Sequence, residues 1–351
     1  MPSVAFVSDD FSVVDGKPIP NGCTWYRCVL PGRELSARGW ELGIGYPAVS
    51  PELGIGLADR AEDGTDRMLA GWDVIVLKLT MHRVVLEAMG IKACPSRIAV
   101  DVDDFHAGLH ESNLATRSTD PFMNPDVNRG FYERIIRAAE FITVSTEFLA
   151  NHYERRVRDV RLVRNAIDYE RFPQADLSLP VIGWVGATPW RSRDIEQLVS
   201  WLPRFVRDTG VRVHHSGHIE GDPESFSKRA GVNASTSGME LIDDYPRMLQ
   251  HFSIGLVPLN PIPFNEAKSC IKGLEYAASG IPFIASPTRE YRLLADAGIG
   301  RLAESPDEWY DHALELLDDE IRYREGVRIR DAVRQFGIDK RGDEWVSALS
   351  G

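Results

Sequence analysis

The sequence is poor in cysteine and has no long apolar segment. Its four cysteines show neither metal-ligand spacing nor the density of a disulfide-stabilised domain: Cys23, Cys28, Cys94 and Cys270. The first residues, MPSVAFVSDDF, lack the basic start and apolar core of a signal peptide, and no apolar run elsewhere reaches membrane-spanning length. These absences predict reduced thiols, a cytoplasmic location and no stable insertion into a membrane.

An excess of basic residues and low-complexity segments are also lacking. The chain has 40 Lys and Arg against 52 Asp and Glu, a formal charge of −12, which argues against broad, sequence-independent binding of nucleic acid. With 43% hydrophobic and 26% charged residues, the composition is that of a folded globular protein. A length of 351 residues is enough for two domains, each with its own core, and a cleft between them.

What the sequence does contain is an alternation of apolar strands and helical segments, which occurs twice. The first half predicts strands at 4–8, 40–47, 73–79, 97–102 and 141–145, and helices at 25–38, 82–90, 128–140 and 146–156. After a proline-containing stretch, the second half predicts strands at 181–186, 211–217, 239–242, 253–259 and 282–286. Helices are predicted there at 194–206, 244–251, 267–279, 288–296 and from 306, where Ser305 can cap the helix.

This alternation is typical of α/β folds with parallel sheets. We therefore expect a first Rossmann-like domain over residues 1–168, an interdomain linker over 169–180 and a second Rossmann-like domain over 181–351. The terminal helices of the second domain can pack back on the first.

The segment 264–286, FNEAKSCIKGLEYAASGIPFIAS, predicts chemistry most directly. A helix that begins at Lys268 would place Lys272 and Glu275 on the same side as Lys268. Its start, with Ser269 and two lysines, suits a phosphate group, and a carboxylate further along suits a hydroxyl of a ribose or a sugar. Because a nucleotide sugar contains both groups, the segment is predicted to bind one.

Three segments carry a family resemblance. NAID and RF within 165–172 precede the second domain, VIGWVGATPWRSRDIEQL (181–198) forms its first strand, loop and helix, and LEYAASGIPFIAS (274–286) lies late within it. Together they resemble the GT-B glycosyltransferases, in particular the retaining, family-4-like group. The resemblance implies an α/β fold of two doubly wound, Rossmann-like domains with an interdomain cleft. It also implies sugar transfer from a nucleotide-diphosphate sugar, with retention of anomeric configuration.

The chain departs from the family pattern at two places. The family commonly has two glutamates separated by seven residues, and Glu275 matches the second, whereas Ala267 stands where the first would be. The Lys-x-Gly spacing that follows the first donor-domain strand is replaced by Arg191 and Arg193, either of which could supply a cation for a diphosphate. The donor sugar therefore does not follow from the motif.

The resemblance implies a donor site within 183–193 and 265–276. The expected donor-binding residues are Gly186, Thr188, Arg191, Arg193, Asn265, Lys268, Ser269, Lys272 and Glu275. Because negative charge grows on the departing diphosphate, Arg191 and Lys268 are also expected to act in catalysis. UDP or GDP is the expected nucleotide, and we expect no required cofactor or metal.

The first half offers a candidate base and a candidate loop. Asp103, Asp104 and His106 follow a predicted strand, so they should emerge at the carboxyl edge of the sheet, where one could activate an acceptor hydroxyl. A turn near the start of the chain could approach the diphosphate or the acceptor through Asn21, Gly22, Thr24 and Arg27. The alternatives are structural roles. The acids could cap the loop that follows them, and the turn could be a simple loop.

Several other residues also have a structural interpretation. Lys268 and Lys272 could form a solvated helix face, and Glu275 could pair with either of them. His214 and His215 are adjacent on a strand and point to opposite faces, so they do not indicate a zinc site with His218. Trp184 and Trp190 flank the loop GATP (186–189), where core packing competes with stacking on a base.

Function has alternatives at this stage as well. A nucleotide-sugar epimerase or hydrolase could share the fold, and the missing first glutamate leaves open a non-catalytic nucleotide-sugar-binding protein. The acceptor is not identified by any motif. A glycan, a lipid-linked sugar, a protein, a small molecule or modified DNA would each be compatible with the sequence.

Overall fold

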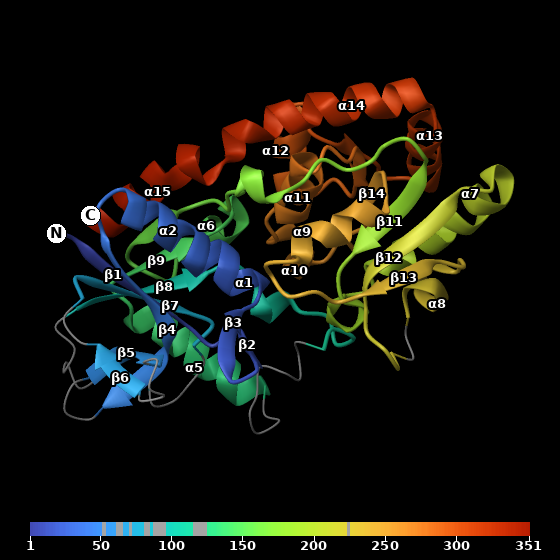
Figure 1. Cartoon of the computed structure of the whole chain (residues 1–351). Helices are drawn as coiled ribbons and strands as arrows, with labels where there is room; N and C mark the ends of the chain where they lie inside the picture. The colour runs from blue at the N-terminus through green and yellow to red at the C-terminus, as the bar shows by residue number, and fades with distance from the viewer. Residues whose placement is uncertain are drawn as a thin grey trace. The chain divides into compact units, whose positions relative to one another are not determined.

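The computed structural model describes residues 1–50, 54–60, 66–69, 72–80, 85–86, 96–114, 125–222 and 225–351. They form two compact units, each of them α/β (Figure 1). Unit 1 comprises Met1–Ala107, Arg117–Asn165 and Ile338–Gly351, and unit 2 comprises Gly108–Thr116 and Ala166–Gly337. The chain therefore passes from one unit to the other more than once.

Within the described ranges, unit 1 has an eight-stranded sheet in the order β10-β9-β8-β7-β1-β4-β5-β6. Its strands are β1 (Ser3–Ser8), β4 (Glu41–Ser50), β5 (Gly54–Arg60), β6 (Asp66–Leu69), β7 (Val74–Lys78), β8 (Arg97–Val102), β9 (Phe141–Val144) and β10 (Val160–Leu162). The pairs from β10 to β4 are parallel, whereas β5 and β6 extend the sheet antiparallel. A separate hairpin consists of β2 (Phe11–Val14) and β3 (Lys17–Pro20).

The helices of unit 1 cover the apolar faces of this sheet. They are α1 (Gly22–Thr24), a π-helical turn (Trp25–Val29), α2 (Leu30–Ala37), α5 (Pro125–Ala138), α6 (Glu147–Tyr153) and α15 (Ile338–Ser350). Figure 1 shows α2 and α15 on one side of the sheet and α5 on the other. Phe6 of β1 and Trp345 of α15 meet edge to face with ring centroids 5.6 Å apart, so the end of the chain completes the core of unit 1.

Unit 2 has a parallel sheet of six strands in the part of the chain that the structure describes, in the order β13-β12-β11-β14-β15-β16. The strands are β11 (Val181–Val185), β12 (Arg212–His218), β13 (Ser235–Gly238), β14 (Ile254–Val257), β15 (Phe283–Ala285) and β16 (Arg301–Leu302). Because all their pairings are parallel, the carboxyl ends of the strands share one edge, where ligands of such sheets bind.

Helices and short turns surround this second sheet. The helices are α7 (Leu202–Thr209), α8 (Phe226–Ala230), α9 (Tyr245–Met248), α10 (Pro263–Glu266), α11 (Ile271–Ala278), α12 (Arg289–Asp296), α13 (Pro306–Leu316) and α14 (Asp319–Ala332). Turns of 3₁₀ helix lie at Tyr169–Arg171, Thr188–Trp190, Ile195–Ser200, Leu249–His251 and Val333–Phe336. One core contains Trp184 and Trp201. The described helices include none that is long and apolar enough to cross a membrane.

One predicted strand and two predicted helices differ from the structure in ways that bear on the site. The strand predicted at 239–242 is wrong, because Met239 and Leu241 are exposed and the strand is β13 just before them. There Ser235 bonds to His214 of β12 at 2.8 Å, and Ser237 bonds to Ser216 at 3.2 Å, which fixes the pairing.

The helix predicted over 267–279 begins later than expected. Residues 263–266 form the separate helix α10, whose last hydrogen bonds run from Ala267 N–H to Pro263 and from Lys268 N–H to Asn265. Helix α11 then starts at Ile271, so Lys268 lies outside it. The helix predicted at 194–206 is likewise two elements, since α7 has Pro203 in its first turn. The helix predicted at 82–90 lies outside the described residues except at 85–86.

Candidate functional site

The carboxyl edge of the unit 2 sheet begins at Gly186, directly after β11. Gly186 has φ +135°, and a Cβ atom there would lie 2.6 Å from the Arg191 guanidinium, so a larger residue would displace that group. The Arg191 guanidinium lies 5.4 Å from the centroid of the Trp184 ring, and its Nε is buried with no hydrogen-bond partner among the described residues. The loop therefore presents a cation over the strand end.

Helix α11 is held close to this edge by its one tyrosine. The Tyr276 hydroxyl accepts a hydrogen bond from the Val185 N–H and donates one to the Leu256 carbonyl, both at 3.3 Å. The ring can approach because Gly255 of β14 has no side chain, and a Cβ atom there would lie 2.6 Å from Tyr276. The helix ends at Ala278, and Gly280 with φ +70° turns the chain toward β15.

Lys272 lies one turn before Tyr276 and reaches back to the strand end. Its ammonium group donates to the Val185 carbonyl at 2.5 Å and lies 5.7 Å from the centroid of the Trp184 ring. Burial, with the nearby cations Arg191 and Lys268 and against the opposing effect of Glu275, lowers the pKa of Lys272 to about 7. Arg191 and Lys268 are thus close enough to Lys272 to disfavour its positive charge, an arrangement suited to a bound polyanion.

Glu275 follows on the same helix and is almost fully buried, with 4% of its surface exposed. Its Oε2 accepts a hydrogen bond of 2.6 Å from the Tyr245 hydroxyl, which comes from α9. Lys268 places its ammonium group 4.6 Å from the centroid of the Phe264 ring, and Ser269 is half-buried next to it. The structure thus brings Gly186, Arg191, Lys268, Lys272 and Glu275 to one end of the sheet.

Other residues that were predicted to bind the donor substrate form hydrogen bonds that stabilise the loop around Arg191. The Thr188 hydroxyl donates to Asp222, and Asn265 donates to Asp194 at 2.6 Å. Arg193 is exposed, with φ +60°. The side chains of Thr188 and Asn265 therefore have partners that fix the backbone around Arg191.

His215 is a supporting residue that sequence reasoning did not identify. The Nε2–H donates to the Gly186 carbonyl at 2.8 Å, and the ring packs against Trp184 and Phe226. Burial lowers the pKa of His215 to about 4, so the ring is neutral at pH 7. His214 points elsewhere, to Ser235, as the strand alternation predicts. Trp184 is buried and Trp190 is 39% exposed.

In unit 1, Arg27 is buried in an ion-pair network. Its Nη2 donates to Asp101 at 2.6 Å, and its Nη1 donates to the Val163 carbonyl at 2.7 Å and to Asn165 at 2.9 Å. Lys78 pairs with Asp103 and lies 3.8 Å from Asp101. Burial alone would lower the pKa of Lys78, but the two carboxylates outweigh it and hold that pKa above its usual value. The Arg27 side chain is therefore held by hydrogen bonds within the core of unit 1.

The predicted turn at Asn21 is organised by Asp10. Asn21 donates to the Asp10 carboxylate at 3.0 Å, and the Thr24 hydroxyl donates to the Asp10 carbonyl at 2.8 Å. Burial raises the pKa of Asp10. Gly22 is exposed at the first position of α1, with open space where a Cβ atom would be.

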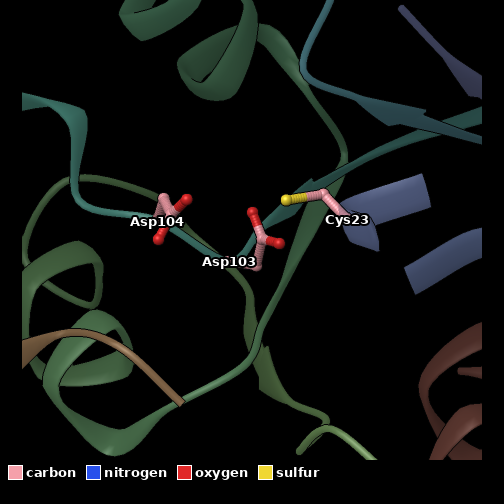
Figure 2. A group of neighbouring side chains, drawn as sticks. All are labelled: Cys23, Asp103 and Asp104. Carbon is pink, nitrogen blue, oxygen red and sulfur yellow. The ribbon is translucent and has the colours of Figure 1, made fainter. Parts of the chain in front are cut away.

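One described cluster in unit 1 has donor atoms close enough for a metal ion. Cys23, Asp103 and Asp104 place one ligand atom each within 4.8 Å of one another (Figure 2). The cluster fits a metal poorly, because Lys78 already pairs with Asp103 and burial raises the pKa of the Cys23 thiol well above its usual value. Asp104 is half-buried, and His106 lies edge to face with Tyr132, ring centroids 5.7 Å apart.

Comparison with known proteins bears on the second unit first. Residues 179–319 match the family model "Glycosyl transferases group 1", a range that includes the site around Arg191 and Glu275. No curated protein matches the sequence.

Solved structures match the whole chain. Sucrose-phosphate synthase from Thermosynechococcus elongatus has a TM-score of 0.66 at 13% identity, over 99% of this chain and 98% of that one. HepE from Anabaena, in complex with UDP and glucose, has a TM-score of 0.63 at 12% identity over 100% of both chains. An Escherichia coli trehalose-6-phosphate protein bound with UDP-2-fluoro glucose has a TM-score of 0.59 at 10% identity, over 99% and 98%. The chain has the fold of these two-domain enzymes.

Proposed function

We propose that this chain, a GT-B glycosyltransferase with a group 1 match in unit 2, transfers a sugar from a UDP-sugar to an acceptor hydroxyl with retention of configuration. The observation that carries the proposal is the group of three cations beside a buried carboxylate at the carboxyl edge of the unit 2 sheet: Arg191, Lys268, Lys272 and Glu275. UDP is the proposed nucleotide because two of the similar structures contain UDP or a UDP-sugar.

The proposed chemistry follows from where charge appears. When the bond between the sugar and the diphosphate breaks, negative charge grows on the departing diphosphate and positive character grows at the anomeric carbon. Arg191 and Lys268 would stabilise that negative charge, and Lys272 would add a third donor on the same side. Because Arg191 comes from a loop held by hydrogen bonds and Lys272 from an anchored helix, these two groups need little reorganisation during the reaction.

We propose that the Glu275 carboxylate binds a hydroxyl group of the donor. Its carboxylate is oriented by Tyr245 at 2.6 Å, so it can accept a hydrogen bond from a ribose or sugar hydroxyl in a fixed direction. The proposal assigns nucleotide binding to residues 183–193 and 265–276. It gives Ala267, which stands where the first of the two glutamates was expected, no role in holding the sugar.

The acceptor is assigned to unit 1. Asp104, half-buried beside Asp103, is the proposed group that takes the proton from the acceptor hydroxyl, because the carboxylate of Asp103 is paired with Lys78. No step requires a metal ion at this cluster.

A donor panel tests the proposal. UDP- and GDP-sugars would be assayed for binding by thermal shift and for release of nucleoside diphosphate, with and without acceptors. Lys268→Ala and Glu275→Ala should weaken donor binding and reduce turnover, whereas Arg324→Ala, on an exposed side chain, should change neither. The site assignment fails if both site variants behave as the wild type.

Product analysis by NMR separates the chemical alternatives. Transfer to an added acceptor with the anomeric configuration of the donor supports the proposal. Free sugar or an isomerised donor in the absence of acceptor would instead indicate a hydrolase or an epimerase. Tight donor binding with no product across many acceptors would indicate a binding protein.

A further inference from the structure

A short segment from the first part of the chain belongs to unit 2 and contacts the loop around Arg191, which we call the donor loop. We call residues 108–114 the strap; they lie within the Gly108–Thr116 part of unit 2, shortly after Asp104 and His106 in the sequence. The Leu114 N–H donates to the Pro189 carbonyl at 2.9 Å. A turn orders the strap, in which the Asn113 N–H donates to the His110 carbonyl at 2.9 Å.

Asn113 makes the most specific contacts of the strap. Its side-chain amide donates to the Trp190 carbonyl at 3.0 Å and to the Ser192 hydroxyl at 3.2 Å. These acceptors belong to the two residues on either side of Arg191. Asn113 is 1% exposed and Ser192 is 0% exposed, so water does not compete for these bonds.

The rest of the loop is held from other sides. The Asn260 amide donates to the Ser192 carbonyl at 3.1 Å, and the Arg191 N–H donates to the Thr188 carbonyl at 3.2 Å. Asn113 supplies the hold on the Trp190 carbonyl, which immediately precedes Arg191. Its amide suits this task because both of its hydrogens are donors and both acceptors are oxygen atoms.

We propose that Asn113 is a positioning residue for Arg191, fixing the backbone so that the guanidinium meets the diphosphate of the donor. The inference rests on the proposed function of Arg191. A guanidinium binds an oxyanion well only in a narrow range of orientations, and a side chain on an unfixed loop loses that orientation when its backbone rotates. Asn113 thus acts through Arg191 and does not touch the donor.

Binding of UDP alone, measured by isothermal titration calorimetry, tests the inference. Asn113→Leu keeps the size of the side chain and removes both hydrogen bonds, and we expect about tenfold weaker binding. Ser192→Ala removes one acceptor without changing the strap and should weaken binding by a smaller factor. Because Ser192→Ala leaves Asn113 in place, it keeps the test valid if Asn113→Leu does not fold.

Double variants distinguish positioning from a general structural effect. Asn113→Leu should cost no further affinity in an Arg191→Ala protein, because the side chain that it orients is gone, and should keep its full effect in a Lys268→Ala protein. An equal loss in both backgrounds would show a structural role only and would overturn the inference.

The two proposals fail in different ways. If Arg191→Ala weakens UDP binding and Asn113→Leu and Ser192→Ala do not, the inference alone is wrong. If Arg191→Ala itself binds UDP as the wild type does, the assignment of Arg191 to the donor fails, and the inference fails with it.

Discussion

At the scale of single residues, the site combines groups that are costly to bring together without a ligand. The Lys272 ammonium group donates a hydrogen bond to the Val185 carbonyl and lies near two other cations. Glu275 is buried and accepts a hydrogen bond of 2.6 Å from the Tyr245 hydroxyl. A bound diphosphate would relieve the repulsion among the cations, so occupancy and protonation should be coupled.

Lys272 should make UDP binding depend on pH above neutrality. With a pKa of about 7 in the free protein, it is mostly cationic below that pH and mostly neutral above it. A diphosphate favours the cation, so binding takes up a proton, and affinity should fall as the pH rises from about 7 to 8.5, by at most about tenfold per pH unit. Titration calorimetry across this range measures the slope.

Lys272→Met should flatten that slope, and Lys268→Met provides the control that should retain it. Comparing variants cancels the ionisation of UDP itself, which is common to all of them. Equal slopes in wild type and Lys272→Met would contradict the assignment of the titrating group to Lys272.

Glu275 should accept a hydrogen bond from a hydroxyl of the nucleotide. Glu275→Gln replaces a charged acceptor with a neutral one, and hydrogen bonds to charged groups contribute about 1.5–3 kcal/mol, or roughly ten- to a hundredfold in affinity. Wild type should prefer UDP over 2′-deoxy-UDP, and the variant should lose most of that preference. Tyr245→Phe, which removes the hydroxyl that orients the carboxylate, should give a smaller loss. If Glu275→Gln keeps the preference for UDP over 2′-deoxy-UDP, Glu275 does not bind the ribose, and a hydroxyl of the sugar becomes its proposed partner.

At the scale of elements, the site depends on how closely α11 approaches the sheet. Two glycines on that face leave room for aromatic rings: Cβ atoms at Gly183 and Gly255 would lie 2.0 Å from Phe252 and 2.6 Å from Tyr276. The Tyr276 hydroxyl then bonds to two strands. The position of Lys272 is thus a consequence of residues that have no side chain.

Gly255→Ala should move α11 and destabilise unit 2. The added methyl group overlaps the Tyr276 ring, whose neighbours leave it no space, so we expect a loss of about 1–3 kcal/mol in the free energy of unfolding and weaker UDP binding. Gly22→Ala is a matched control, because open space surrounds that position. Urea unfolding measures both variants, and equal stability of the two would refute this account of the packing.

The elements also show what the sequence could predict. Strands such as β1, β7 and β11 are continuous apolar runs buried in a parallel sheet, so hydrophobicity alone located them. Ser305 caps α13 as predicted, with the Glu308 side chain returning the bond. The edge strand β13, STSG, has little apolar character, and it is held by side-chain bonds to β12 that no local pattern encodes.

The candidate site could be predicted in part for a similar reason. Residue types and spacing pointed to Lys268, Lys272 and Glu275, and the family resemblance pointed to Arg191; the structure gathers all four at one sheet edge. The supports could not be found in this way, because His215, Tyr245 and Asn113 form hydrogen bonds to residues distant in the sequence. Only tertiary structure brings such partners together.

At the scale of the whole molecule, each unit is built from segments that are not contiguous in the sequence. Unit 1 includes α15, whose Trp345 and Leu349 are buried in its core. Arg97 donates to the Leu349 carbonyl at 3.1 Å, and Arg38 pairs with Asp343. The last helix is therefore a structural part of unit 1, although all of unit 2 from Ala166 onward precedes it.

Trp345→Ala should thus destabilise unit 1 and leave unit 2 largely unaffected. Removing a buried tryptophan costs about 3–5 kcal/mol, and this side chain is 2% exposed. Hydrogen exchange with mass spectrometry should show faster exchange in β1 and β7 and little change in β11 and β14. Lys340→Ala, at an exposed position of the same helix, is the control. Equal acceleration in both units would show that they unfold together.

The strap has a consequence for how such a gene can evolve. Recombination that replaced residues 166–337 would exchange most of unit 2, yet it would leave Asn113 behind, because the codon for Asn113 lies upstream of that range. Chimaeras that inherit the strap from the same parent as the donor loop should retain nucleotide affinity more often than those that mix parents. Unit 2 is thus split in the gene, and its smaller piece, which contains the strap, lies between two segments of unit 1.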